Sequence, residues 1–396
     1  LLAILSGPDE LERHRNRNGG EFCALIFAAS LGMILMASAA NTIVMFLGLE
    51  LFSIALYLLC IFFPDSAPSR ESGMKYFLLS SAASAVLLYG LALLYGATGT
   101  TWIGEMSGPE GLQGGLAIVG TGFVLCGLLF KLAAVPFHFW APDVYQGAPT
   151  TVTAFMSVAT KVAALAALWR FVEQFGGASA GQLAHLILFS LAILSMLVGN
   201  FLALSQQDLK RMLAYSGVAN GGYLLIAPIV YEDMMGPMFF FLASYLLGNV
   251  GAFLAVAQIE ALQKGPVDRQ SVKGLFHRNP WVAGCLALCL VSLTGLPPTA
   301  GFMAKFFLFG KAINVGNLLL PIFGVVGSLI GAAYYLGTAI TLFARTDGAD
   351  DSATESEEVV DDESITSPSQ AALAFCSLGV LVLGILPAGF LHWITQ

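Results

Sequence analysis

The sequence predicts an all-α polytopic membrane protein with about eleven transmembrane helices. The chain of 396 residues is 57% hydrophobic and 11% charged, with a mean hydropathy of +0.80, whereas soluble domains usually carry about twice that charge. Its apolar residues fall in runs of about 20, the length that an α-helix needs to cross a bilayer. Two of these runs are interrupted by prolines at corresponding places, which predicts two inverted five-helix repeats, each with a broken fourth helix.

The individual spans follow from their lengths and from the breaks between them. The stretch over 21–63 is too long for one crossing, and Ala39-Ala40-Asn41 divides it. Prolines interrupt the fourth and ninth spans, and an acidic loop separates the tenth from the last. In chain order, the spans are expected near 21–39, 41–63, 74–96, 116–140, 150–172, 183–204, 209–230, 237–262, 281–312, 317–343 and 371–394.

Loop charges predict which face of the membrane each loop occupies. The loops on the Leu1 side carry eleven basic residues, against only Arg170 and Lys311 on the opposite side. The positive-inside rule places this basic face in the cytoplasm or its organellar equivalent. The eleven residues are Arg13, Arg15, Arg17, Arg70, Lys210, Arg211, Lys264, Arg269, Lys273, Arg278 and Arg345.

The chain is therefore expected to have five parts. These are a cytoplasmic-side segment over 1–20, the two repeats over 21–172 and 183–343, an acidic cytoplasmic-side loop over 344–370 and a last helix over 371–396. The loop holds nine of the 25 acidic residues, so the rest of the chain is near neutral and shows no nucleic-acid surface. Its composition favours a solvated connector.

The fourth member of each set of five spans is broken by prolines. One break runs from Val135-Pro136 through Pro142, and the other is Gly295-Leu296-Pro297-Pro298. Because five crossings is an odd number, the two halves enter the membrane from opposite faces, as in transporters with inverted repeats. Backbone groups freed at such breaks need water or polar partners, so we expect a hydrated path near the middle of the membrane.

Deep charged residues are costly in a bilayer unless they are paired, hydrated or neutralised. The spans contain one such acid, Glu50, and three such bases, Lys131, Lys161 and Lys305. Burial disfavours a charged lysine and a carboxylate favours it, so a change in the separation of Glu50 and Lys131 would change the lysine's proton affinity. Moving one charge against 100 mV needs about 2.3 kcal/mol, which is within reach of such a change. This composition predicts a proton relay.

Two further residues are candidates for the relay, and structural alternatives remain open. His138 lies inside the first break, where it would either pass protons or tie down the loop. Lys75 begins its span, where it would either join the relay or extend its amine to the membrane surface. Each deep lysine would otherwise bond to backbone carbonyls at a break, and Glu50 would be a protonated packing residue.

The sequence contains no motif for a bound cofactor or for covalent chemistry. Its six cysteines all lie in apolar runs, without the spacing of an iron–sulfur site or a disulfide framework. The 43 glycines include no phosphate-binding or dinucleotide-binding signature, and no zinc-protease motif or nucleophile elbow occurs. We therefore expect no cofactor in this chain.

The stretch from Lys131 to Pro149 contains Pro-Phe-His-Phe-Trp-Ala-Pro-Asp-Val-Tyr-Gln-Gly-Ala-Pro and resembles the antiporter-like subunit N family of respiratory complex I, the counterpart of mitochondrial subunit 2. Nearly the whole chain shares this resemblance, because further motifs follow in the family's order. They are Gly48-Leu-Glu-Leu, Glu71-Ser-Gly-Met-Lys-Tyr, Ser205-Gln-Gln-Asp-Leu-Lys-Arg-Met-Leu-Ala-Tyr-Ser and Leu296-Pro-Pro-Thr-Ala-Gly-Phe-Met-Ala-Lys-Phe. The family usually has three further helices before the first span, and their absence agrees with a truncated or shortened chain.

The resemblance implies an antiporter-like fold and a proton-translocating membrane-arm subunit of NADH:quinone oxidoreductase. NADH, FMN, iron–sulfur clusters and quinone are expected in other subunits. The implied partners are the other membrane-arm subunits, including antiporter-like ones, and the lipid bilayer of a bacterial inner membrane or an organellar energy-converting membrane. The implied site residues are Glu50 paired with Lys131, Lys161 as the central relay, Lys305 toward the far-side exit, and Lys75 and His138 at matching motif positions.

Other functions remain as alternatives. Subunits of multisubunit monovalent cation/proton antiporters and of membrane-bound hydrogenases share this fold and the same plan of glutamate and lysines. The stretch from Asp143 to Pro149 favours subunit N, because those relatives usually depart from it there. A membrane scaffold would leave the deep charges unexplained. Sodium as the coupling ion is also open, although a lysine-rich path favours protons.

Overall fold

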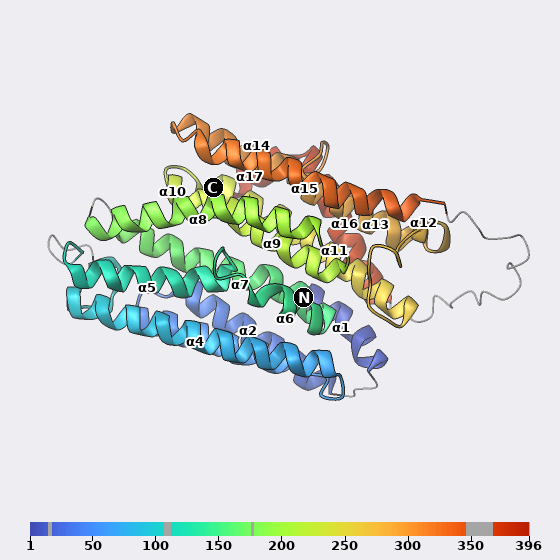
Figure 1. Ribbon diagram of the computed structural model, residues 1–396, viewed down its shortest axis with the longest axis horizontal. Coiled ribbons are helices and arrows are strands. Elements are labelled where there is room, and N and C mark those ends of the chain that lie inside the picture. Colours follow the sequence, from blue (N-terminus) through green and yellow to red (C-terminus); the bar gives the residue numbers. More distant parts are fainter. Residues whose placement is uncertain (15–17, 107–111, 176–177, 346–366, 396) are drawn as a thin grey trace, which may run out of the picture.

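The computed structural model describes residues 1–14, 18–106, 112–175, 178–345 and 367–395, and these ranges contain helices and no β-strand (Figure 1). The helices are α1 (Leu2–Arg13), α2 (Gly19–Ser38), α3 (Thr42–Cys60), α4 (Ala67–Thr98), the 3₁₀ helix η1 (Ile103–Glu105), α5 (Gly115–Leu132), α6 (Trp140–Gly147), α7 (Thr150–Phe175), α8 (Ser179–Leu204), α9 (Leu209–Leu224), α10 (Ile226–Val230), α11 (Met235–Gln263), α12 (Leu275–Arg278), α13 (Pro280–Thr294), α14 (Ala300–Asn314), α15 (Leu319–Phe343), α16 (Ser367–Ile385) and α17 (Pro387–Thr395).

The prediction of an all-α membrane protein is confirmed. Among the described residues, ten helices are long and apolar enough to cross a membrane. The remaining expected span, 281–312, is divided into α13 and α14, which have 15 residues each and are individually too short to cross. The expected span 116–140 was wrong at its end, because α5 stops at Leu132.

Local backbone chemistry explains where both broken helices stop. Ala133 follows α5 with a left-handed φ of 54°, and Pro136 then lacks the N–H that a continuing helix needs. Gly295 follows α13 with a φ of 89°, where the absence of a side chain makes this conformation accessible. Pro297 and Pro298 come next, and α14 begins only at Ala300. Each break therefore leaves the carbonyl end of a helix inside the bundle.

The helices form a bundle whose centre is made by α7, α9 and α11. In Figure 1, α4 and α5 lie along one edge of the bundle and α14 along the other, with these three helices between them. The apolar windows of α7, of α9 with α10, and of α11 are 78%, 89% and 83% buried, whereas those of α2, α4 and α16 are 33% buried. Lys161 on α7 thus lies in the most enclosed layer.

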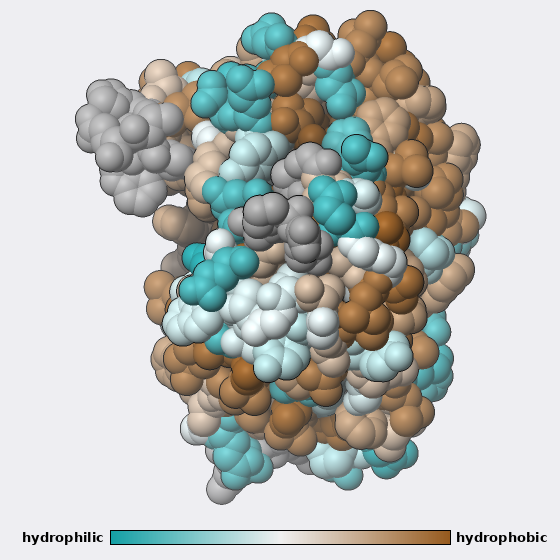
Figure 2. Space-filling view, turned by 90° about the vertical axis from the view of Figure 1, so that its left-hand side faces the viewer, coloured by the Kyte–Doolittle hydropathy of each residue, from teal (hydrophilic) through white to brown (hydrophobic). Residues whose placement is uncertain are grey.

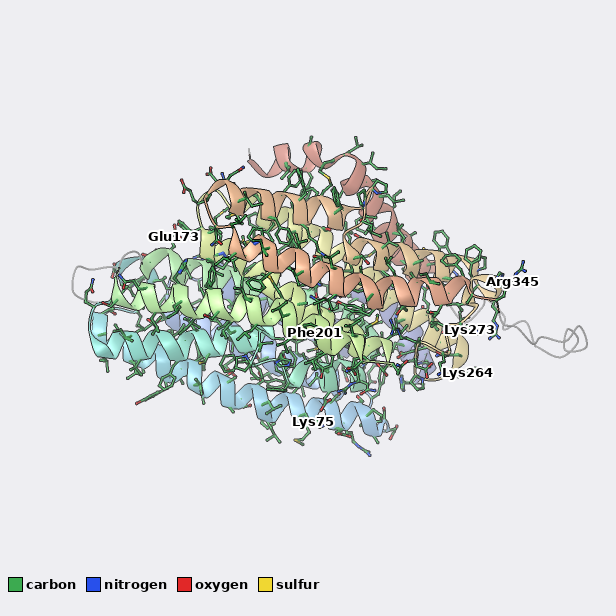
Figure 3. All side chains as sticks on the ribbon, turned by 45° about the horizontal axis from the view of Figure 1, so that its top comes forward. Lys75, Glu173, Phe201, Lys264, Lys273 and Arg345 are labelled. Atoms are coloured by element: carbon green, nitrogen blue, oxygen red, sulfur yellow. The ribbon has the colours of Figure 1, made fainter. Side chains whose placement is uncertain are left out.

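The surface has the polarity of a membrane protein. Phe201 on α8 and Leu329 on α15 are 58% and 69% exposed, as expected for side chains that face lipid. Figure 2 shows polar residues gathered on one end of the bundle, with apolar residues along its flanks. In Figure 3, Lys264, Lys273 and Arg345 lie at one end and Glu173 at the opposite end.

Several sequence-based predictions fall on parts of the chain outside the described residues or differ from the structure. Arg15, Arg17 and the acidic residues over 347–363 lie outside the described ranges. The helix order agrees with two sets of five, α2 to α7 and α8 to α15, but the domain division stays a prediction. The segment over 1–20 contains helix α1, which sequence analysis missed and which packs against α7, α11 and α16.

Gly301 allows the two halves of the second broken helix to meet. A Cβ atom at Gly301 would lie 1.7 Å from the backbone carbonyl oxygen of Ser292, whereas one at Gly310 on the same helix would meet nothing within 4 Å. We expect Gly301→Ala to lower the free energy of unfolding by about 1–3 kcal/mol, because the backbone must move. Gly310→Ala should leave it equal or raise it by up to about 1 kcal/mol. Thermal unfolding of the purified complex measures both, and equal melting temperatures for the two variants would contradict this interpretation.

Candidate functional site

Lys131 lies in the last turn of α5 and is 2% exposed. Its Nζ donates hydrogen bonds to the hydroxyl of Ser53 on α3 at 2.7 Å and to that of Ser80 on α4 at 2.6 Å. The same nitrogen lies over the rings of Phe52 and Tyr76, 5.3 and 5.8 Å from their centroids. Two hydroxyls and two aromatic faces therefore hold the amine, and the hydroxyls can pass protons.

Glu50 lies one helical turn before Ser53 on α3, which bonds Lys131, but the structure does not join Glu50 and Lys131 in an ion pair. Within the described part of the chain, the Oε1 atom of Glu50 is buried and has no hydrogen-bond partner. A buried carboxylate oxygen is costly without a proton or a donor. The direct pairing of Glu50 with Lys131 that the resemblance implies is therefore not present in this conformation. The lysine amine donates its hydrogen bonds to two serine hydroxyls instead.

Lys161 lies in the middle of α7 and is 1% exposed. Its Nζ donates a hydrogen bond of 2.6 Å to the carbonyl oxygen of Leu132, the last residue of α5. That carbonyl has lost its helical partner at the first break, and the end of a helix carries partial negative charge. A lysine from a different helix thus provides the hydrogen bond that the carbonyl group at the first break lacks.

Lys305 provides hydrogen bonds to the free carbonyl groups at the second break in a similar way. Its Nζ donates to the carbonyl oxygens of Leu293 at 3.2 Å and Thr294 at 2.9 Å, at the end of α13. It also lies 5.2 Å from the centroid of the Tyr223 ring. The alternative that the lysines bond to carbonyls at breaks therefore describes the geometry of Lys161 and Lys305, and it is compatible with proton transfer.

Polar side chains extend from Lys305 across the second half of the protein. Tyr334 on α15 donates a hydrogen bond of 2.9 Å to Asn200 on α8, and the Asn200 amide donates to the Tyr223 hydroxyl at 3.3 Å. Because Tyr223 also lies beneath the amine of Lys305, these groups form one connected set. Hydroxyl and amide groups in such a set can hold water within the bundle.

His138 and Lys75 have contrasting surroundings. His138, in the first break, is 2% exposed, and neither ring nitrogen is hydrogen-bonded to a side chain in the described ranges. Its ring contacts those of Phe139 and Tyr215. The Lys75 side chain is 43% exposed and pairs with Glu71 at 2.7 Å and Asp143 at 3.1 Å. The structure therefore buries the histidine but does not bring Lys75 into the set of buried lysines.

Asp143 joins the first break to the start of α9. Its carboxylate accepts a hydrogen bond of 2.6 Å from Arg211 as well as the one from Lys75. Partial burial would raise the pKa of Asp143, but the hydrogen bonds from Arg211 and Lys75 outweigh it and hold this pKa below its usual range. The ion pairs therefore form above that lowered pKa and are lost as the pH falls through it.

A buried charge cluster at the basic face was missed by sequence analysis. Glu10 on α1 accepts hydrogen bonds from the backbone N–H groups of Thr150 and Thr151 at 2.7 and 2.9 Å, and from the Thr151 hydroxyl. Arg13, Lys210 and Glu260 complete the cluster through ion pairs of 3.3 Å between Arg13 and Glu260 and 3.7 Å between Lys210 and Glu260. The sequence contained one signal for Glu260. This acid lies eleven residues, or about three helical turns, after Asn249, so the two polar side chains share one face of the predicted helix.

The described residues contain no group of three or more histidine, cysteine or acidic side chains arranged to hold a metal ion. The six cysteines are unpaired thiols.

Comparisons with known proteins agree with this architecture. Residues 39–331 match the family described as NADH:quinone oxidoreductase/Mrp antiporter, transmembrane. NADH-quinone oxidoreductase subunit N from Desulfovibrio desulfuricans is 42% identical over all of this chain and 80% of its own length. The same subunit from Trichlorobacter lovleyi is 39% identical with equal coverage.

Solved structures show the same fold. A chain of respiratory complex I from Thermus thermophilus superimposes with a TM-score of 0.79 at 34% identity, covering 99% of this chain and 84% of that one. A chain of the Mrp complex from Dietzia superimposes with a TM-score of 0.77 at 22% identity, covering 94% of this chain and 79% of that one, and shares the fold.

Proposed function

Because this chain belongs to the subunit N family of NADH-quinone oxidoreductase, we propose that its deep charged residues form the relay that carries protons across the membrane. The chain is a multi-pass inner-membrane protein and a proton-translocating membrane-arm subunit, which assembles with the other membrane-arm subunits. Redox chemistry takes place elsewhere in the complex, where NADH, FMN, iron–sulfur clusters and quinone are bound. The relay consists of Glu50, Lys131, Lys161 and Lys305, with His138 beside it.

The observation that carries this proposal is the burial of Lys131 and Lys161 and the partial burial of Lys305, each without a partner carboxylate among the described residues. Lys131, Lys161 and Lys305 all donate to neutral oxygen atoms, from serine hydroxyls or from carbonyls at the breaks. A buried lysine in neutral surroundings is poised to lose its proton, because burial disfavours the ammonium form. Glu50 can bias this equilibrium at Lys131, because it lies one turn of α3 from Ser53, whose hydroxyl bonds the lysine amine.

Glu50→Gln tests the first step of the relay. Glutamine keeps the size of the side chain but loses the charge that acts on Lys131, so we expect NADH-driven proton pumping to fall several-fold, with Glu50→Asp intermediate. Proton uptake by membrane vesicles, measured beside NADH oxidation, gives the result. Glu71→Gln is the matched control, because Glu71 is an exposed acid on α4 that pairs with Lys75. Equal pumping by Glu50→Gln and Glu71→Gln would remove Glu50 from the relay.

A further inference from the structure

Glu260 lies where water at the basic face meets the bundle interior. It is 7% exposed and accepts a hydrogen bond of 2.7 Å from the hydroxyl of Thr150, the first residue of α7. Lys210 and Arg13 pair with the same carboxylate. Lys210 also donates to Thr150, at 2.9 Å, so hydrogen bonds and an ion pair join the acid, the base and the hydroxyl in one cluster.

A cavity of about 800 Å³ adjoins this cluster. Glu260, Lys210 and Thr150 line it, together with the exposed residues Glu12 and Lys264. Because its wall includes exposed charged side chains, water from the basic face reaches Glu260 directly. Lys264 marks this end of the bundle in Figure 3.

A stripe of polar residues leads inward along α7 from this cavity to Lys161. Thr150, Thr153, Ser157 and Lys161 follow one another at intervals of three and four residues, which places them on one face of the helix. All four are at most 1% exposed. The eleven residue steps from Thr150 to Lys161 correspond to about 16 Å along the helix axis.

Polar residues of α11 lie opposite this stripe, where α7 and α11 pack together. The Asn249 amide donates a hydrogen bond of 2.7 Å to Ser157. The side-chain carbonyl oxygen of Asn249 and the hydroxyl of Tyr245 are buried and have no hydrogen-bond partner within the described residues. A Cβ atom at Gly217 on α9 would lie 3.2 Å from the Tyr245 hydroxyl and 3.8 Å from Cε of Lys161, so both side chains line the same space.

We propose that Glu260 is the proton acceptor at the basic face and that the α7–α11 seam delivers its protons to Lys161. The seam is formed by Thr150, Thr153, Ser157, Asn249 and Tyr245. Water in the cavity gives a proton to the Glu260 carboxylate, which weakens the pairing with Lys210. Water between the hydroxyls carries the proton onward. The Thr153 and Ser157 hydroxyls turn away from the backbone carbonyls to which they donate, and each accepts one proton and releases its own through water toward the next group, with water also at the unpartnered atoms of Asn249 and Tyr245, until the neutral amine of Lys161 is protonated. This inference rests on the role proposed for Lys161.

Glu260→Gln and Thr150→Val in the complete complex test the seam. Both remove a proton carrier while keeping the shape of the side chain, so we expect proton uptake per NADH oxidised to fall roughly tenfold. Glu12→Gln, which removes an exposed carboxylate from the same cavity, is the matched control and should pump normally. Vesicles prepared from each strain report uptake and NADH oxidation together.

Acetate distinguishes proton delivery from a structural role. As a small weak acid it can enter the cavity and replace the missing carboxyl, so it should restore pumping in Glu260→Gln but not in Thr150→Val. A structural role would instead lower the amount of assembled complex, leave pumping per complex unchanged and show no acetate effect. If Glu260→Gln fails to assemble, Thr150→Val alone decides, and normal pumping by that variant overturns the proposal.

Failure of the seam and failure of the relay give different results. If Glu50→Gln loses pumping while Glu260→Gln and Thr150→Val keep it, the relay stands and protons reach Lys161 by another route. If all three variants pump normally, both proposals fall.

Discussion

Lys131→Met is expected to lower NADH-driven proton pumping by roughly tenfold or more in an assembled complex. Methionine is one heavy atom shorter than lysine and suits the apolar surroundings of Phe52 and Tyr76, so the end of α5 should stay folded. It cannot accept or release a proton, and the hydroxyls of Ser53 and Ser80 lose the group that connects them. Proton uptake by vesicles, normalised to the amount of assembled complex, measures the effect.

Lys311→Met is the matched control for this variant. Lys311 lies in the last turn of α14 and pairs at 3.0 Å with Asp233, whose side chain is 81% exposed. Exposed ion pairs contribute only about 0–1 kcal/mol, so losing this one should affect neither pumping nor assembly. Lys131→Met that pumps as well as Lys311→Met would favour the scaffold interpretation over the relay.

Lys305→Gln is expected to abolish most proton pumping, and Lys305→Arg should do the same for a different reason. Glutamine still donates hydrogen bonds but carries no exchangeable charge. Arginine keeps the charge and can donate to the carbonyls of Leu293 and Thr294, but its guanidinium does not release its proton in proteins. Comparing the two variants separates a role of Lys305 in proton transfer from a role in hydrogen bonding to the carbonyl groups at the break.

The measurement is again proton uptake per assembled complex, accompanied by thermal unfolding. If Lys305→Arg pumps normally while Lys305→Gln is impaired, the lysine serves only as a fixed charge at the break. If both lose pumping and Lys305→Arg melts near the wild-type temperature, the role in proton transfer is supported. A Cβ atom at Gly295 would lie only 3.0 Å from Cδ of Lys305, so space around this side chain is limited and the melting temperature also reports any crowding by the larger arginine.

Local chemistry made most of the fold predictable. Runs of about 20 apolar residues predict transmembrane helices because an unpaired backbone is too costly in lipid. The two breaks were predictable because proline lacks an N–H group wherever it occurs. The end of α5 was misplaced because Ala133, an ordinary helix former, adopts a left-handed conformation that its identity does not indicate.

The candidate site was predictable in its members but not in its contacts. Glu50, Lys131, Lys161 and Lys305 stood out because a charge in an apolar run is costly in any fold. Their partners were not readable from the sequence. Ser53 and Ser80 are small polar residues like many others, and one hydroxyl in a helix carries little signal.

The sequence by itself determined that this protein is a membrane bundle with two broken helices and deep lysines, since those features depend on the local preferences of each residue for lipid or for helix. Only the tertiary structure decided that Lys161 donates a hydrogen bond to the carbonyl oxygen of Leu132, 29 residues away, and that Glu10 and Glu260 meet at the start of α7. A hydrogen bond or an ion pair requires its two groups to come within a few ångströms. Helices distant in the sequence reach that separation only through the packing of the whole bundle.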